Sequence, residues 1–207
     1  TPNAPDPREA SARLTLGVAS TAHGAASGEV HATANLPLSW GTSAVRVTAW
    51  NEVDGGYLDS PGGGLDNTDR TRRRGARDMG LWQATDDLSL AATLIDQTLS
   101  TRDAHYVDPS LRPLARAAAV AEPHDNDFLA LALAAHWSPA WGRLTISLGA
   151  LDHDVSTTYD ASGAPALLIA PGAHGATFED GNEIRGVVGE MRLSSIGAGR
   201  LHWTLGA

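Results

Sequence analysis

Apolar and polar residues alternate one by one through most of this chain, and this period of two constrains its fold more than any other feature. The clearest example is segment 29–36, in which Glu29, His31, Thr33 and Asn35 alternate with Val30, Ala32, Ala34 and Leu36. Successive side chains of a β-strand point to opposite faces of a sheet, whereas a helix repeats every 3.6 residues. The segment is therefore predicted to be a strand with one polar and one apolar face.

The same alternation predicts about nine antiparallel strands after a proline-containing lead-in at 1–10. They centre on residues 13–18, 29–36, 45–49, 74–82, 88–97, 129–137, 143–148, 183–194 and 200–205. Segment 74–82 has the weakest pattern. Within 183–194 the polar side changes near 187–189, which predicts a β-bulge. We expect one all-β domain over 1–207, an antiparallel up-and-down meander that is part of, or related to, a transmembrane β-barrel.

The connections between these strands alternate in length. Short turns at 39–42, 83–87, 138–142 and 196–199 alternate with longer loops at 22–27, 55–71, 100–125 and 156–181. Residues 111–122, rich in alanine and arginine, are compatible with a short helix. Transmembrane β-barrels have short periplasmic turns, long extracellular loops and aromatic girdles. The interface aromatics expected at the short-turn end are Trp40, Trp82, Trp137 and Trp141.

Composition excludes several functions. The 207 residues contain no cysteine, which excludes disulfides, cysteine zinc sites and thiol catalysis. The net charge of −9 disfavours a nucleic-acid partner. No run approaches the ~20 apolar residues of a membrane helix, but a membrane strand needs only ~9–11 residues with one apolar face. Because no hydrolase or phosphate-binding motif occurs, we expect no enzyme activity and no cofactor. A β-rich hydrolase that uses paired carboxylates is the weakest alternative.

Several strings resemble the barrel domain of TonB-dependent outer-membrane receptors of Gram-negative bacteria. They are ANLPL (34–38) with AVRVTAWNEVDGGY (44–57), RTRRRGAR (70–77) with WQATDDLSL (82–90), VSTTYDAS (155–162), and NEIRG and GEMRLSS (182–195) with GRLHWTLGA (199–207). The resemblance implies a barrel of about 22 strands around an N-terminal plug. It also implies energised uptake of a siderophore, a vitamin or a glycan.

The resemblance covers only the first part of such a barrel. Residues 4–11, APDPREAS, resemble the linker after the plug, so the chain is expected to lack the plug. We interpret the chain as the N-terminal part of a receptor barrel, or a truncated relative, located in the outer membrane and surrounded by outer-membrane lipid. Open sheet edges are not tolerated in lipid, so the remaining barrel strands or another chain are expected as partners. The ligand is not identified by the sequence.

Two groups of charged residues are candidate sites. Six residues of the polar strand faces are expected to line the lumen, namely Arg13, Glu29, His31, Asn35, Arg46 and Arg143. A basic cluster is expected to bind a ligand or lipopolysaccharide phosphates at the outer rim, namely Arg70, Arg72, Arg73, Arg74 and Arg77. The alternative is that these arginines pair with nearby carboxylates, namely Asp59, Asp66, Asp69 and Asp78.

Candidate metal ligands occur at three places, although no metal is expected. Asp66, Asn67 and Asp69 are either Ca²⁺ ligands or an ordinary turn. Segments 124–127 (HDND) and 152–154 (DHD) place carboxylates beside imidazoles. Because adjacent strand residues point to opposite faces, His153 is not expected to share a site with both of its neighbours.

The main alternative to a membrane barrel is a soluble antiparallel β-sheet that acts as a binding or adhesive module. The two-sided polarity of 74–82 and an aromatic content of 5% favour this alternative. It predicts that apolar faces pack on one another, with Leu131 and Ile146 buried in protein. The membrane hypothesis predicts instead that the purified chain requires detergent.

Overall fold

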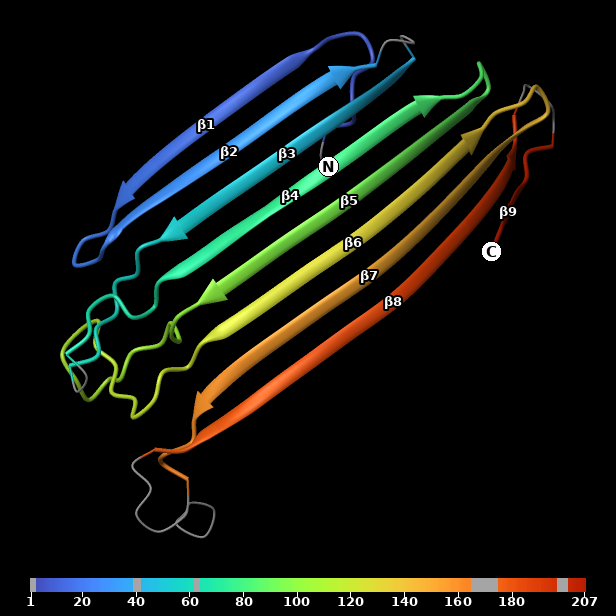
Figure 1. Cartoon of the computed structure of the whole chain (residues 1–207). Coiled ribbons are helices and arrows are strands. Elements are labelled where there is room, and N and C mark those ends of the chain that lie inside the picture. Colours follow the sequence, from blue (N-terminus) through green and yellow to red (C-terminus); the bar gives the residue numbers. More distant parts are fainter. Residues whose placement is uncertain (1–2, 39–41, 62–63, 165–174, 197–200) are drawn as a thin grey trace.

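The chain forms a single open antiparallel sheet of nine strands, arranged in the order in which they follow one another in sequence (Figure 1). The computed structural model describes residues 3–38, 42–61, 64–164, 175–196 and 201–207. The strands are β1 (Ser11–Ser20), β2 (Ala26–Pro37), β3 (Ser43–Asp54), β4 (Thr71–Gln83), β5 (Leu88–Thr101), β6 (His124–Trp137), β7 (Gly142–Asp160), β8 (Thr177–Ser195) and β9 (Thr204–Gly206). The all-β meander is therefore confirmed, including the weakly patterned β4.

The pairing register runs without interruption, and the predicted bulge at 187–189 is wrong. Gly142 at one end of β7 lies opposite Ser195, and Asp160 at the other end lies opposite Thr177, with every residue between them in step. The change of polar side has a different cause. Glu183 and Arg185 lie beyond the apolar part of their face, so β8 changes environment there without changing register.

Two expectations about the connections and one about the last strand need correction. The first connection spans only residues 21–25 and is short, although it was expected among the longer loops. Residues 111–122 form no helix, because Leu114 adopts a left-handed φ of 60° directly after Pro113. β9 is shorter than expected. The turn at 39–42, with Trp40, and most of the turn at 196–199 lie outside the described residues.

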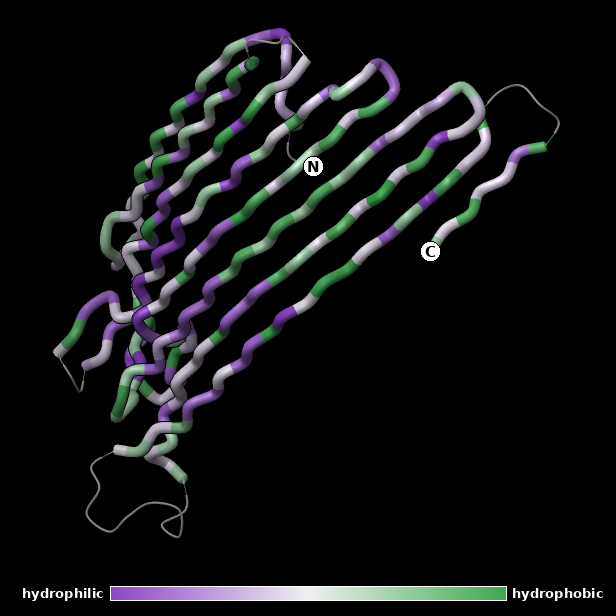
Figure 2. Tube along the Cα trace, turned by 45° about the vertical axis from the view of Figure 1, so that its right-hand side comes forward, coloured by the Kyte–Doolittle hydropathy of each residue, from purple (hydrophilic) through white to green (hydrophobic). Residues whose placement is uncertain are grey.

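Directly opposite residues share a face, so the register divides the side chains into a polar and an apolar face. One row of the polar face joins Arg13, Thr33, Thr48 and Arg77 across four strands. The hydropathy alternation along the strands is visible in Figure 2. We call the central part of the other face the apolar band; it consists of the alternate residues within 14–18, 30–36, 45–49, 76–82, 88–94, 129–137, 144–150 and 187–193.

The apolar band is not covered by any part of the chain that the structure describes. The accessible surface is 13530 Å², whereas a compact protein of 21.5 kDa exposes roughly 9,200 Å². Within the band Leu131 is 41% and Val187 is 85% exposed. The buried apolar residues of the described chain are Ala44, Leu58 and Ala115, and two of these lie in loops. The sheet therefore does not bury its own apolar face.

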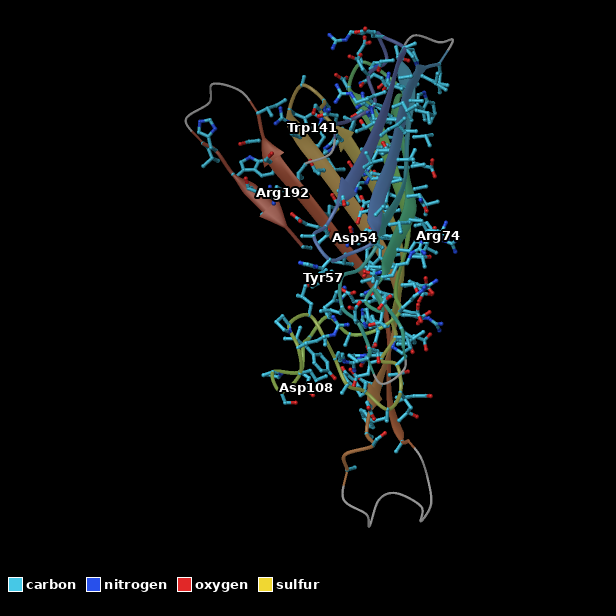
Figure 3. All side chains as sticks on the ribbon, turned by 90° about the vertical axis from the view of Figure 1, so that its left-hand side faces the viewer. Asp54, Tyr57, Arg74, Asp108, Trp141 and Arg192 are labelled. Carbon is cyan, nitrogen blue, oxygen red and sulfur yellow. The ribbon has the colours of Figure 1, made fainter. Side chains whose placement is uncertain are left out.

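The long loops gather at one end of the sheet, on the side of the polar face. Figure 3 shows Tyr57 and Asp108 on the same side as Arg192 of the polar face, whereas Arg74 points to the opposite side. Loops 55–70 and 102–123 bind each other through their backbones, with Arg116 N donating to Asp59 O at 2.9 Å. We call these two loops the loop cap. Among the residues described, no helix is long and apolar enough to cross a membrane.

Candidate functional site on the polar face and in the loop cap

All six residues predicted to line a lumen lie on the polar face. The register places Asn35 opposite Arg46, and Arg143 opposite Ser194. Asn35 is only 1% exposed because it holds the lead-in against the sheet. Its Oδ1 accepts a hydrogen bond from Asp6 N at 2.8 Å, and its Nδ2 donates to Glu9 O at 2.6 Å. Asn35 thus anchors the lead-in to the polar face.

A network of charged and polar side chains joins β2, β3 and β4 on the same face. His31 Nε2 lies 3.1 Å from a carboxylate oxygen of Glu52 and 3.5 Å from one of Glu29. These side chains bring three possible metal-ligand atoms within 4.8 Å of one another. However, Arg73 Nη1 contacts Glu52 at 2.6 Å and already supplies a positive charge there. The network therefore accounts for the arrangement without a metal ion.

The basic cluster expected from the sequence does not form one surface. Arg73 and Arg77 lie on the polar face, while Arg72 and Arg74 lie on the other face, beyond the apolar band. Alternation along β4 separates them, because neighbouring strand residues point to opposite faces. Arg70 precedes β4 and lies in the loop cap.

The alternative pairing of these arginines with four nearby aspartates is also wrong. Within the described chain none of them forms an ion pair with Asp59, Asp66, Asp69 or Asp78. Asp59 binds Arg112 at 2.8 Å, and Asp69 Oδ1 accepts the backbone amides of Tyr57 and Leu58 at 2.7 and 2.8 Å. Asp69 therefore fixes a loop turn and does not share a calcium site with Asp66, which lines a cavity described below.

Carboxylates of three strands oppose one another beyond the apolar band. Asp127, Asp154 and Glu183 occupy one cross-strand row. Oxygen atoms of Asp152, Asp154 and Glu183 come within 4.8 Å of one another, and Arg185 pairs with both Asp152 and Glu183. His153 points to the polar face, where its Nε2 lies 3.0 Å from Asn126 Oδ1, so it shares no site with Asp152 or Asp154, as expected.

The sequence did not predict a buried polar centre in the loop cap. Arg116 is 2% exposed and forms ion pairs with Asp103 and Glu122, which are 6% and 5% exposed. The Tyr106 hydroxyl donates to Glu122 Oε2 at 2.6 Å and accepts from Arg116 Nη2 at 3.0 Å. Glu122 Oε1 also accepts the backbone amide of Asp160 at 2.6 Å, which ties the loop cap to β7.

The hydrogen-bonded hydroxyl of Tyr106, which is partly buried, gives this centre a pH dependence. Burial, followed by the hydrogen bond to Glu122, raises the pKa of Tyr106 above its ordinary value of about 10. The folded loop therefore favours the neutral phenol. This contribution to stability is fully present below the ordinary pKa and is lost as the pH rises through the raised pKa.

The pKa of Tyr106 is testable by phenolate absorbance. The phenolate absorbance that is lost in the Tyr106→Phe variant belongs to Tyr106. We expect this absorbance to rise with a midpoint above pH 10. The matched control is Tyr159→Phe, because Tyr159 lies on β7 outside the Arg116 centre. A Tyr106 midpoint at or below 10 contradicts the hydrogen bonding described above.

A cavity of about 460 Å³ lies at the meeting point of loop 21–25 and the loop cap. Residues of all three loops line it, including His23, Tyr57, Asp66, Asn67, Arg112 and Leu114. Its members are far apart in sequence, so only the folded loops bring them together. The sequence signal that marked part of it was the Asp66–Asn67 pair after a glycine run, interpreted there as a calcium site or a turn.

Comparisons of the chain with protein-family models, with curated proteins and with solved structures found no match. The resemblance to TonB-dependent receptors therefore stays a prediction, carried by the strings quoted above. Function has to be inferred from the two faces of the sheet and from the loop cap.

Proposed function

We propose that the chain is a segment of an outer-membrane β-barrel that resembles a TonB-dependent receptor and serves the uptake of a small ligand. The observation that carries the proposal is the uncovered apolar band on a single sheet of unbroken register. An exposed apolar surface of this extent marks contact with another protein or with a membrane. In this proposal the apolar band contacts lipid and the polar face lines a lumen.

The order of residues along the apolar face supports lipid as the contact. On β6 the apolar stretch 129–137 has about nine residues, and a membrane strand needs ~9–11. Trp82 and Trp137, which are 52% and 39% exposed, lie at the short-turn end of the band. Charged residues such as Arg74 and Asp152 follow at the other end. Aromatic, apolar and charged zones in this order match a strand that crosses from the periplasm to the outside.

The two edges of the sheet and the outer rim define the proposed partners. β1 is an edge strand, and within the described chain residues 203–207, which include β9, hydrogen-bond to β8 only between Met191 and Ser195. Further barrel strands or another chain are therefore proposed to pair with the free backbone groups, which lipid does not satisfy. Arg72 and Arg74 are proposed to meet lipopolysaccharide phosphates.

Lipid contact is testable by tryptophan fluorescence. We expect the purified chain to require detergent and, in vesicles with brominated acyl chains, to show strong quenching. Trp82→Phe should reduce the quenchable fluorescence and leave the share contributed by Trp137, because both side chains lie on the apolar face. The matched control is Trp50→Phe, since Trp50 lies on the polar face opposite His31 and Gly75. A chain that is monomeric without detergent, with equal quenching losses in both variants, contradicts the proposal.

One observation favours the alternative of a soluble β-sheet binding module. Asp78 lies on the apolar face, opposite Val47 and Leu94. A charge facing lipid is costly, whereas a protein partner can supply a counter-charge. In this alternative a protein surface covers the apolar band, and the chain remains in solution as a complex or oligomer without detergent.

A further inference from the structure

The apolar band, all of whose residues the structure describes, contains one charged residue, Asp78 on β4. Its cross-strand neighbours are Val47 and Leu94, which are both apolar. The side chain is exposed, and its carboxylate forms no ion pair or hydrogen bond with the part of the chain that is described. Arg74, four residues earlier on the same face, points away from the loop cap in Figure 3, so these loops do not cover Asp78 either. Ionisable residues within membrane-spanning segments are rare and typical of functional sites.

Asp78 lies near the middle of the band, away from the level of lipid headgroups. It is four residues from Trp82, which lies at the short-turn end of the band on the same strand. Four strand residues span roughly 13 Å, and the apolar band of a membrane barrel is about 25 Å tall. The ammonium group of a phospholipid therefore stays too far from Asp78 to pair with it. A basic protein side chain reaches this depth, because lysine and arginine lay their apolar stems along apolar surface.

A hollow of about 460 Å³ in the apolar band adjoins Asp78. We call it the apolar hollow. It is lined by the cross-strand row Val45, Gly80, Ala92, Leu133 and Leu148 and by the next row toward the short turns, which contains Trp82. The surface is low at Gly80, where an added Cβ would meet no atom within 4 Å. Because Gly80 is the next residue after Asp78 on this face, the carboxylate stands at the outer end of the apolar hollow.

We propose that Asp78 and the apolar hollow form a docking site for a second protein, whose contacting segment carries a lysine or arginine beside a bulky apolar side chain. The basic side chain pairs with Asp78, and the apolar side chain fills the hollow over Gly80. These two positions are roughly 7 Å apart along β4, and residues four apart on a helix are separated by about 6 Å. One turn of a partner helix therefore supplies both groups.

Charge complementarity favours a protein over lipid as the occupant. An acyl chain fills the apolar hollow but leaves the carboxylate of Asp78 without a counter-charge, which is costly in apolar surroundings. The partner covers the band around β4, while the remaining strands stay in contact with lipid. This assignment of a partner rests on the proposed membrane location of the apolar band.

Energy transfer from tryptophan to dansyl-labelled peptides tests the docking site in dioleoylphosphatidylcholine vesicles that contain the full chain. The probes are helical leucine-alanine peptides of about 20 residues, which differ only in a central lysine, leucine or glutamate. We expect the lysine peptide to associate about tenfold more tightly than the other two. Asp78→Asn should remove this advantage. Gly80→Leu should weaken association of the lysine peptide about tenfold, because the new side chain occupies the apolar hollow.

Two variants on the same face are matched controls. Asp127→Asn removes a carboxylate beyond the band on β6, and Ala32→Leu adds a leucine side chain to the band on β2, outside the apolar hollow. Both should leave association of the lysine peptide unchanged. Equal association of the lysine and leucine peptides overturns the proposal, as does a lysine preference that persists in Asp78→Asn or is lost equally in the controls. A chain that is quenched by brominated lipid but shows no lysine preference retains the proposed function and loses only the docking site.

Discussion

Replacing Leu131 with arginine is expected to destabilise the reconstituted chain by roughly 2–4 kcal/mol, the cost of a cationic side chain that faces the middle of a bilayer. Leu131 lies in the apolar band, directly opposite Leu94 on β5 and Ala150 on β7, so no carboxylate lies directly opposite the introduced charge. The free energy of unfolding in vesicles, measured by denaturant titration, gives the size of the effect.

Two variants on the same strand control for the substitution itself. Ala132→Arg places the same side chain on the polar face, opposite Thr93 and Gly149, and should cost little. Leu129→Arg should cost less than Leu131→Arg, because Leu129 lies opposite Asp96 and Asp152 at the edge of the band. Equal costs at 131 and 132 would show that the apolar band does not face lipid.

The second large effect is expected at Arg116. Arg116→Met leaves Asp103 and Glu122 buried without their counter-charge, and breaking a buried pair in this way costs about 3–5 kcal/mol. We expect the loop cap to open while the sheet stays folded, because the Arg116 centre lies in loops 102–123 and at the outer end of β7. Hydrogen exchange should therefore accelerate at residues 102–123 and not at β5 or β6.

Arg112→Gln is the control in the same loop. The Arg112 side chain is 58% exposed and pairs with Asp59 at 2.8 Å, and exposed pairs contribute only ~0–1 kcal/mol. In the Arg112→Gln variant, residues 102–123 should keep nearly normal protection against hydrogen exchange. Unchanged protection in Arg116→Met, or a loss as large in Arg112→Gln, contradicts the central role of Arg116.

The period of two was sufficient to predict the sheet and its two faces. Arg13, Asn35 and Arg143 share the polar face because strand geometry alone determines side-chain direction. The same rule, applied to 70–77, separates Arg72 and Arg74 from Arg73, so the expected single basic cluster neglected a constraint that the sequence already contained. The bulge predicted at 187–189 was wrong because Glu183 and Arg185 lie beyond the apolar band on the same face. The surroundings of β8 change there, but its backbone register does not.

The loop cap and its cavity were beyond prediction from local pattern. Arg116 pairs with Asp103 and Glu122, and Asn67 lines one cavity together with His23 and Leu114 from other loops. Such contacts depend on how loops pack over the sheet, and no periodic signal encodes them. The lead-in anchor at Asn35 escaped prediction for the same reason, although the residue itself was assigned to the correct face.

The unbroken register of β7 and β8 also limits how genes for this sheet can change in length. One extra codon within either strand would turn every following side chain to the wrong face, until a compensating loss restored the phase. Insertion of two residues into each of the two strands would lengthen the hairpin and keep every side chain on its face. Variation in strand length among natural homologues of this sheet should therefore occur in even steps, and odd steps should be confined to the connections.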